Sequence, residues 1–243
     1  MTKQRLDIAL VSTGLASTRS QAENLIKLGK VKVSDKLANK PSQLISSSDL
    51  LNISLIERDQ YVSRAAYKLE SAVNKFKLSF KDKVVLDVGS STGGFSDFAL
   101  RRGAAQIIAV ESGTNQMHPK LRDNPKIELH EKTDIRDFKV VSHIDIVLID
   151  VSFISVREVL LDLKTKLDET SEFIVLVKPQ FEAKLQNLKH KGVIKNDKIR
   201  RQIFKDFENW VKKDYLIIDK IDSGVSGTKG NLERLYKLML SKP

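Results

Sequence analysis

Two charged residues come directly after strongly apolar segments of this sequence. Asp150 ends the segment IDIVLID, and Lys178 ends the segment EFIVLVK. A lysine amine can accept a proton from a hydroxyl group or stabilise the oxyanion that forms there, and a neighbouring carboxylate can orient the amine. Together these residue types indicate chemistry at a weakly acidic hydroxyl group.

Both residues are expected at strand ends in one sheet. The apolar segments VVLDVG, IIAVE, IELHE, IDIVLID and EFIVLVK alternate with helical patterns, one after Gly94, a short one broken at Pro119 and one in VREVLLDLKTKL. This alternation is typical of a parallel sheet with helices on both faces. Because the carboxyl ends of parallel strands meet at one rim, we expect Asp150 and Lys178 to lie side by side.

The last part of the chain predicts an antiparallel edge to this sheet. A helix is expected from about Ile199 to Asp214, and the segments YLIIDKID and ERLYKLML follow it closely enough to pair with each other. The sequence therefore predicts an α/β, Rossmann-like fold with a mostly parallel seven-stranded sheet whose last strands are antiparallel.

A glycine-rich turn follows the first strand. Residues 84–95 read VVLDVGSSTGGF, a buried strand that runs into a turn and a helix, where backbone can approach a ligand closely. The glycine spacing is G-x-x-x-G-G, unlike the G-x-G-x-x-G of dinucleotide-binding folds, and no P-loop lysine follows. S-adenosylmethionine therefore fits better than NAD or ATP. The predicted cofactor contacts here are Asp87, Gly89, Ser91, Gly93, Gly94 and Phe95.

Acidic residues at later strand ends extend this predicted site. Glu111 ends the second strand, where a carboxylate can accept both hydroxyls of a ribose. Asp134 follows the third strand and can accept a hydrogen bond from an adenine amino group. Each residue alone is equally well explained as a solvated acid, but the ordered set favours a cofactor site.

The methyl acceptor is expected to be an oxygen atom. The segment that starts at Asp150 reads DVSF, unlike the D-P-P-Y type of enzymes that methylate base amines, and the chain has no cysteine to attack a cytosine ring. A ribose 2′-hydroxyl is a poor nucleophile, so it needs a positioned base or a charge that stabilises the alkoxide. Lys178 suits either role, and both stay open at this point.

Residues 1–57 predict a separate small α+β unit, joined by a linker at residues 58–62 to a catalytic domain at 63–243. Its second helix is expected to open at Ser17 or Thr18. The apolar residues of that helix should face inward, namely Ala22, Leu25, Ile26 and Leu28. The first helix of the catalytic domain, in SRAAYKLESAVNKF, should bury Leu69, Val73 and Phe76.

The charge balance favours a nucleic acid partner. The 243 residues include 42 lysines and arginines against 31 aspartates and glutamates, a net charge of +11. Such a charge attracts nucleic acid through phosphate contacts and counterion release. The candidates for phosphate contacts are Arg5, Arg19, Lys27, Lys30, Lys32 and Arg64, with Lys68 continuing this surface.

Several classes of function are disfavoured. With no cysteine and four scattered histidines, the chain offers no disulfide and no metal-ligand spacing. Its longest apolar runs are far shorter than the roughly 20 residues of a membrane-spanning helix. The N-terminus lacks the pattern of a secretory signal, so we expect a cytoplasmic protein without a metal or a membrane partner.

An ordered set of motifs resembles one family nearly end to end. RLD, TR, LI and GKVKV within residues 5–33 resemble an S4-type RNA-binding domain, and YVSRAAYKL, LDVGSSTGGF, DVSFIS, LVKPQFEA, KGVIK and GTKGNLE follow in order. The chain resembles the TlyA family, ribosomal RNA cytidine 2′-O-methyltransferases that also carry the label hemolysin. The resemblance implies S-adenosylmethionine as cofactor, ribosomal RNA in ribosomal subunits as partner, and a catalytic tetrad shared with FtsJ-like enzymes: Lys68, Asp150, Lys178 and Glu233.

The sequence departs from the family pattern at four positions. The family usually has Asp at Glu111, a glycine near Asn115, Asn near Asp134 and Pro at Thr228. The first change preserves a carboxylate, whereas those at Asn115 and Asp134 weaken the cofactor assignments there. Two other functions stay open: a non-catalytic RNA-binding or ribosome-assembly factor, which an intact tetrad opposes, and a membrane-active hemolysin, for which the chain shows no lytic helix.

Overall fold

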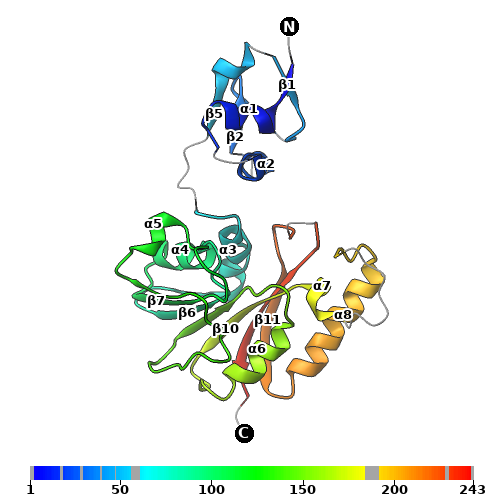
Figure 1. Cartoon of the computed structure of the whole chain (residues 1–243). Coiled ribbons are helices and arrows are strands. Elements are labelled where there is room, and N and C mark those ends of the chain that lie inside the picture. The colour runs from blue at the N-terminus through cyan, green and yellow to red at the C-terminus, as the bar shows by residue number, and fades with distance from the viewer. Residues whose placement is uncertain are drawn as a thin grey trace. The chain divides into compact units, whose positions relative to one another are not determined.

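The computed structural model divides the chain into two compact units, Met1–Gln60 and Tyr61–Pro243 (Figure 1). It describes residues 3–16, 19–27, 30–38, 40–46, 48–55, 61–183, 192–227 and 230–241. Each unit has hydrophobic clusters made of its own residues. Within the described residues, no helix combines the length and the apolarity that crossing a membrane requires.

The N-terminal unit packs two helices against short strands. Leu6, Leu10 and Ile26 are buried between α1, α2 and β2, and the predicted inward positions Ala22 and Leu25 are also buried, whereas Leu28 lies outside the described residues. Strand β2 is central in the order β3-β2-β5, and β1 pairs with β4. The elements are β1 (Gln4–Arg5), α1 (Leu6–Ser12), α2 (Arg19–Lys27), β2 (Val31–Val33), β3 (Lys36–Leu37), β4 (Leu44–Ile45), the 3-10 helix η1 (Asp49–Asn52) and β5 (Ile53–Leu55).

The catalytic unit is built on a seven-stranded sheet with the order β11-β12-β10-β9-β6-β7-β8. The pairs β10–β12 and β11–β12 are antiparallel and the other pairs are parallel, which confirms the predicted fold class. Its elements are α3 (Ala65–Phe76), β6 (Val84–Val88), α4 (Gly94–Arg101), β7 (Gln106–Val110), α5 (Pro119–Arg122), β8 (Ile127–His130), β9 (Ile146–Ile149), α6 (Val156–Leu163), β10 (Glu172–Val177), α7 (Pro179–Glu182), α8 (Asp197–Val211), β11 (Tyr215–Asp222) and β12 (Arg234–Leu240).

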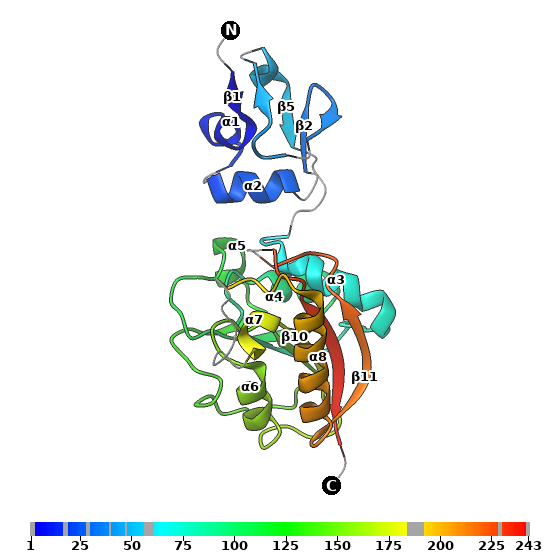
Figure 2. The ribbon, with the colours of Figure 1, turned by 90° about the vertical axis from the view of Figure 1, so that its right-hand side faces the viewer.

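Alternate residues of the central strands face opposite sides of the sheet. Val85 of β6 packs with residues of α3 and α4, whereas its neighbour Leu86 packs in the cluster that contains α6 and α8. Figure 2 shows the two sets of helices around the sheet. Burial on both faces explains why these strands are apolar at nearly every position.

The strand order reverses direction between β6 and β9. From β6 the chain proceeds outward to β7 and β8, and it then returns to β9 and β10 on the other side. Ligands of open α/β sheets bind at such a switch point, outside the carboxyl ends of the strands. The glycine-rich turn after β6 and Asp150 after β9 therefore share this crevice.

Several predicted boundaries differ from the structure. Pro119 begins α5 instead of breaking a helix, because proline is well tolerated in the first helical turn. The last helix starts at Asp197, where Asn196 caps it, and it ends at Val211. Tyr61, predicted to be in the linker, packs edge-on against Tyr67 and thus belongs to the catalytic unit.

Candidate active site

Four charged side chains form one cluster at the carboxyl end of the sheet. The ammonium of Lys178, directly after β10, lies 2.6 Å from Asp150 Oδ1. The ammonium of Lys68, on α3, lies 4.0 Å from Asp150 Oδ2 and 2.7 Å from Oε2 of Glu233, which precedes β12. The predicted tetrad thus comes together from four distant segments, with Glu233 paired to Lys68 and not to Lys178.

The cluster is largely removed from solvent. Lys68, Lys178 and Glu233 are buried. The prediction that Lys68 continues an exposed basic surface was therefore wrong. Burial pushes the pKa of Asp150 upward, but the positive charges of Lys178 and Lys68 outweigh it and hold that pKa below its usual value. Asp150 is therefore a carboxylate at neutral pH, and it holds both lysines in place.

Ser152 adds a contact that the sequence did not predict. Lys178 Nζ donates a hydrogen bond of 2.8 Å to Ser152 Oγ, so Asp150 and Ser152 together fix the direction of the amine. Ser152 belongs to the DVSF segment, which could have signalled this role. Next to it, Phe153 has a left-handed backbone with φ of 71° and a side chain that is 90% exposed.

Two adjoining pockets of about 420 and 240 Å³ meet at this cluster. Both are lined by Gly89, Ser91, Asp150 and Ser152. The larger extends to Glu111 and Asp134, and the smaller also contains Lys68, Asp87, Gly94, Phe95 and Lys178. All the predicted cofactor residues except Gly93 therefore line one of the two pockets.

Glycines are required where the turn passes its neighbours. Gly89 has φ of +78°, and a Cβ there would lie 3.0 Å from the carbonyl oxygen of Asp150. Gly93 has φ of +85°, and its Cβ would lie 2.5 Å from atoms of both Leu121 and Met117. Any side chain at Gly93 would therefore force the side chains of Leu121 and Met117 to move.

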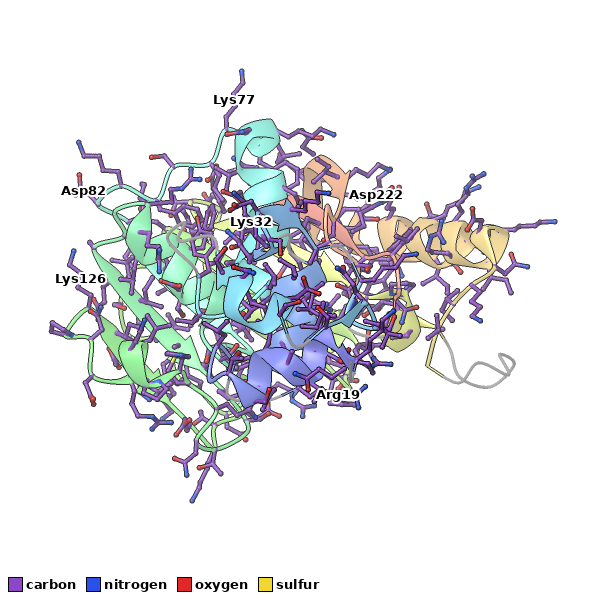
Figure 3. All side chains as sticks on the ribbon, turned by 90° about the horizontal axis from the view of Figure 1, so that it is seen from above. Arg19, Lys32, Lys77, Asp82, Lys126 and Asp222 are labelled. Carbon is purple, nitrogen blue, oxygen red and sulfur yellow. The ribbon has the colours of Figure 1, made fainter. Side chains whose placement is uncertain are left out.

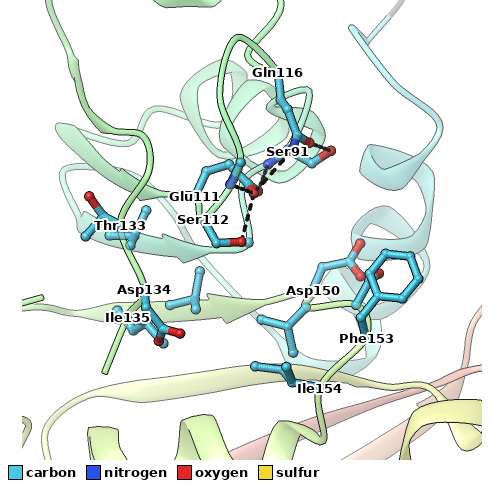
Figure 4. A pocket seen from close by; sticks show the side chains of 16 residues that line it. Ser91, Glu111, Ser112, Gln116, Thr133, Asp134, Ile135, Asp150, Phe153 and Ile154 are labelled. Carbon is cyan, nitrogen blue, oxygen red and sulfur yellow. Dashed lines mark hydrogen bonds between the residues drawn. The ribbon is translucent and has the colours of Figure 1, made fainter. Parts of the chain in front are cut away.

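Glu111 joins two loops at the mouth of the larger pocket (Figure 4). Its carboxylate accepts hydrogen bonds from the backbone N–H of Ser91 at 2.9 Å and of Gly113 at 2.7 Å. The Ser91 hydroxyl also donates to Gln116 Oε1 at 3.1 Å. Asn115, which precedes Gln116 in the chain, has φ of +53°. This left-handed conformation favours glycine and tolerates asparagine, so Asn115 can stand where the family usually has a glycine.

Asp134 has a different environment from the one expected. Its carboxylate accepts from the Arg136 guanidinium at 2.7 and 3.0 Å and from the backbone N–H of Arg136 at 2.9 Å. The hydrogen bonds from Arg136 lower the pKa of Asp134. The residue lines the larger pocket, but an adenine amino group would have to compete with Arg136 for its oxygens.

Asp87 is a buried acid, and one of its two carboxylate oxygens has no hydrogen-bond partner among the described residues. Its Oδ2 accepts from Ser96 Oγ at 2.6 Å, whereas Oδ1 and the hydroxyl of the neighbouring Ser90 have no hydrogen-bond partner among the described residues. Burial raises the pKa of Asp87 to about 7. S-adenosylmethionine carries a positive sulfonium and a positive ammonium group, so these free acceptors fit that cofactor.

Glu182 performs a structural role in the LVKPQFEA segment. Its carboxylate accepts from the Ser155 hydroxyl and the Val156 N–H, both at 2.7 Å, at the start of α6. Burial raises the pKa of Glu182 despite these bonds. Because α7 follows Lys178 directly, this contact fixes α7 and α6 around the cluster, and no pattern in the sequence singled it out.

The predicted phosphate contacts differ in their surroundings. Arg5 and Arg19 both pair with the buried Asp7, and Lys30 and Lys32 are partly buried; Arg19 and Lys32 are marked in Figure 3. The Arg64 guanidinium donates to the carbonyl oxygen of Ser226 at 3.2 Å. The side chain of Lys27 and the family position Thr228 lie outside the described residues.

Comparisons with known proteins agree with this geometry. A family model described as FtsJ-like methyltransferase matches residues 61–238, and an S4 domain model matches residues 4–51. The 23S rRNA (cytidine-2′-O)-methyltransferase TlyA of Campylobacter jejuni is 41% identical, over 78% of this chain and 74% of its own length. The 16S/23S rRNA (cytidine-2′-O)-methyltransferase TlyA of Mycobacterium tuberculosis is 35% identical, over 82% and 75%.

A solved structure extends the likeness to the whole chain. A hemolysin-named protein of Streptococcus thermophilus has a TM-score of 0.74 and 32% identity, and the match covers 100% of this chain and 90% of that one. The fold, the pocket and the matched models define an S-adenosylmethionine-dependent, FtsJ-like methyltransferase with an N-terminal S4 domain. Within that class, the chain belongs to the TlyA family. Among the described residues, no group of three or more potential ligands could hold a metal ion.

Proposed function

We propose that this chain methylates the ribose 2′-oxygen of a cytidine in ribosomal RNA. The observation that carries the proposal is the buried cluster of Lys68, Asp150, Lys178 and Glu233 beside the two pockets. Bound S-adenosylmethionine supplies an electrophilic methyl group. The names of the Campylobacter and Mycobacterium relatives support cytidine in ribosomal RNA as the acceptor.

The residues that would hold the cofactor follow from the pocket. Glu111 lines the larger pocket beside the turn at Gly89 and Ser91, and a carboxylate at this position suits ribose hydroxyls. The free Oδ1 of Asp87 lies in the smaller pocket, on the side of the cluster, and suits a positive group. These contacts would orient the cofactor across the rim of the sheet toward Lys178.

Lys178 acts as a charged donor to the reacting oxygen. An ammonium has three N–H groups, one of which donates to Ser152, while the ammonium forms an ion pair of 2.6 Å with Asp150 Oδ1. A remaining N–H can donate to the ribose 2′-oxygen and stabilise the negative charge that develops there as the hydroxyl proton passes to solvent. The carboxylate of Asp150 lies 2.6 Å from this amine, so a charged donor agrees better with the geometry than a neutral amine that deprotonates the hydroxyl.

Phe153 provides a surface for the base of the target nucleotide. Its exposed ring lies 5.5 Å from the ring of Phe181, beside the larger pocket. Proteins that act on one nucleotide of a structured RNA commonly take its base out of the helix and stack it on an aromatic side chain.

A ribosomal RNA substrate also implies that the chain acts in the cytoplasm, on RNA within ribosomal subunits.

Methyl transfer to ribosomal subunits tests the proposal. Subunits from cells that lack this activity would be incubated with labelled S-adenosylmethionine and the chain, and their RNA digested to nucleosides. We expect the label in 2′-O-methylcytidine, which also makes the adjacent phosphodiester bond resistant to alkali. Label in a methylated base, or no label in any subunit or naked ribosomal RNA, would reject the proposal.

A further inference from the structure

A buried carboxylate joins two exposed arginines in the N-terminal unit. Asp7, at the start of α1, has a fully buried side chain, whereas those of Arg5 and Arg19 are 38% and 54% exposed. Arg5 donates from Nε to Asp7 Oδ1 at 3.0 Å and from Nη2 to Oδ2 at 2.8 Å. Arg19 donates from Nε to the same Oδ2 at 2.9 Å.

The burial of Asp7 calls for an explanation beyond stability. An ionised carboxylate loses its hydration when it is buried, and a buried ion pair is often no more stable than apolar side chains of the same volume. Asp7 lies on α1 with the buried apolar residues Leu6, Ala9 and Leu10. The carboxylate of Asp7 fixes two guanidinium groups at the surface, which an apolar side chain in this position could not do.

Both guanidinium groups keep donors that Asp7 does not use. Each has five N–H groups, of which Arg5 directs two to Asp7 and Arg19 directs one. Arg19 also lies 3.8 Å from Glu23, a distance too long for a hydrogen bond. The planar fork of a guanidinium binds phosphate in a bidentate way, and it loses less entropy on binding when its direction is already fixed.

We propose that Asp7 is a positioning residue that holds Arg5 and Arg19 as one preformed site for the phosphate backbone of RNA. The identification of the polyanion as RNA rests on the proposed function. The site depends on the direction of the two forks, and not on their charge alone.

Two variants separate direction from charge. Asp7→Asn raises the net charge by one, so simple electrostatic attraction predicts tighter binding to RNA, whereas loss of the preformed site predicts weaker binding. Arg5→Lys with Arg19→Lys keeps the charge but removes the forks. Lys36→Arg, at an exposed position of β3, serves as the matched control that also keeps the charge.

The affinity of the full chain for a ribosomal RNA fragment would be measured without cofactor, as a function of salt concentration. We expect both variants to bind about tenfold more weakly, the loss of one charge-assisted contact, with the control unchanged. In methyl transfer, KM for RNA should rise by the same factor while kcat stays constant, which a general loss of structure would not produce. Circular dichroism would verify that Asp7→Asn remains folded, and the double lysine variant carries the test if it does not.

Tighter or unchanged binding by a folded Asp7→Asn variant, or by the double lysine variant, would overturn the inference. The binding measurement requires no catalysis. Wild type that binds RNA through these arginines but transfers no methyl group would thus reject the proposed function and leave the inference standing. Wild type that binds no RNA would reject the inference itself.

Discussion

At the residue scale, the active site depends on a balance of charge. Lys68 and Lys178 carry two positive charges, and Asp150 and Glu233 carry two negative ones, within a chain of contacts of 2.6 to 4.0 Å. Removal of one partner of a buried pair leaves an uncompensated charge that costs about 3–5 kcal/mol. Variants of this cluster therefore need a measurement of folding beside each measurement of activity.

Asp87 should make cofactor binding depend on pH. Burial raises its pKa to about 7, and a bound cation would favour its ionised form. We expect the affinity for S-adenosylmethionine to rise about tenfold from pH 6 to pH 8 in wild type, and to stay flat in Asp87→Asn. Calorimetric titration at several pH values would measure it, with the exposed Asp82→Asn as control.

The same residue should have the opposite effect on folding. Between the usual pKa of 3.8 and about 7, the native state binds more protons at Asp87 than the unfolded state does. The contribution of Asp87 to the free energy of unfolding therefore falls as pH rises through this window. An Asp87→Asn variant with the same pH slope of cofactor affinity as wild type would contradict this account of the site.

The sequence indicated part of this site by simple rules. Asp150 and Lys178 follow adjacent parallel strands, so strand topology alone predicted that they would meet. Lys68 lies on a helix and Glu233 follows a long loop, so only the family resemblance brought them in. Ser152 and Glu182 were missed because their contacts depend on where α6 and α7 begin, which no periodicity in the sequence determines.

At the element scale, the turn between β6 and α4 controls the cofactor pocket. Gly93→Ala and Gly103→Ala both place a side chain at positive φ, which costs about 1–2 kcal/mol in either case. Only at Gly93 would the new Cβ meet Leu121 and Met117; at Gly103 the nearest atom lies 3.5 Å away. We expect Gly93→Ala to lose more stability to denaturant than Gly103→Ala because of this clash, and Gly93→Ala alone to bind S-adenosylmethionine more than tenfold more weakly.

Isothermal titration and urea unfolding would compare these two variants. Equal cofactor affinity in both would show that the close approach at Gly93 does not shape the pocket.

The strands themselves were predictable because burial on both faces makes them continuously apolar. The short helices were not: α7 has four residues and no periodicity, and it forms because Pro179 follows Lys178 and Glu182 anchors it to α6.

At the scale of the whole molecule, the two units divide the work. The clusters that form the catalytic core contain residues only from position 61 onward, so residues 61–243 should fold without the N-terminal unit. A chain that lacks residues 1–60 should bind S-adenosylmethionine as wild type does. Its KM for ribosomal RNA should rise at least about tenfold, because the phosphate contacts that we propose for the S4 domain would be lost.

Steady-state methyl transfer with the shortened chain measures this division. Unchanged KM for RNA would mean that the catalytic unit recognises its substrate alone.

The existence of two units could be predicted from the change in pattern near residue 60. The boundary was less predictable, because Tyr61 looks like a linker residue until the aromatic contacts with Tyr67 and Phe98 are seen.

The central claim, that the charged cluster carries out methyl transfer, is tested most directly by single-turnover transfer to ribosomal RNA with wild type, Lys178→Ala and the exposed control Lys126→Ala. Loss of the charged donor at the reacting oxygen should lower the rate by about 10²–10⁴, with affinity for S-adenosylmethionine nearly unchanged and the control equal to wild type. A folded Lys178→Ala variant that forms 2′-O-methylcytidine at a rate near that of wild type would contradict the account.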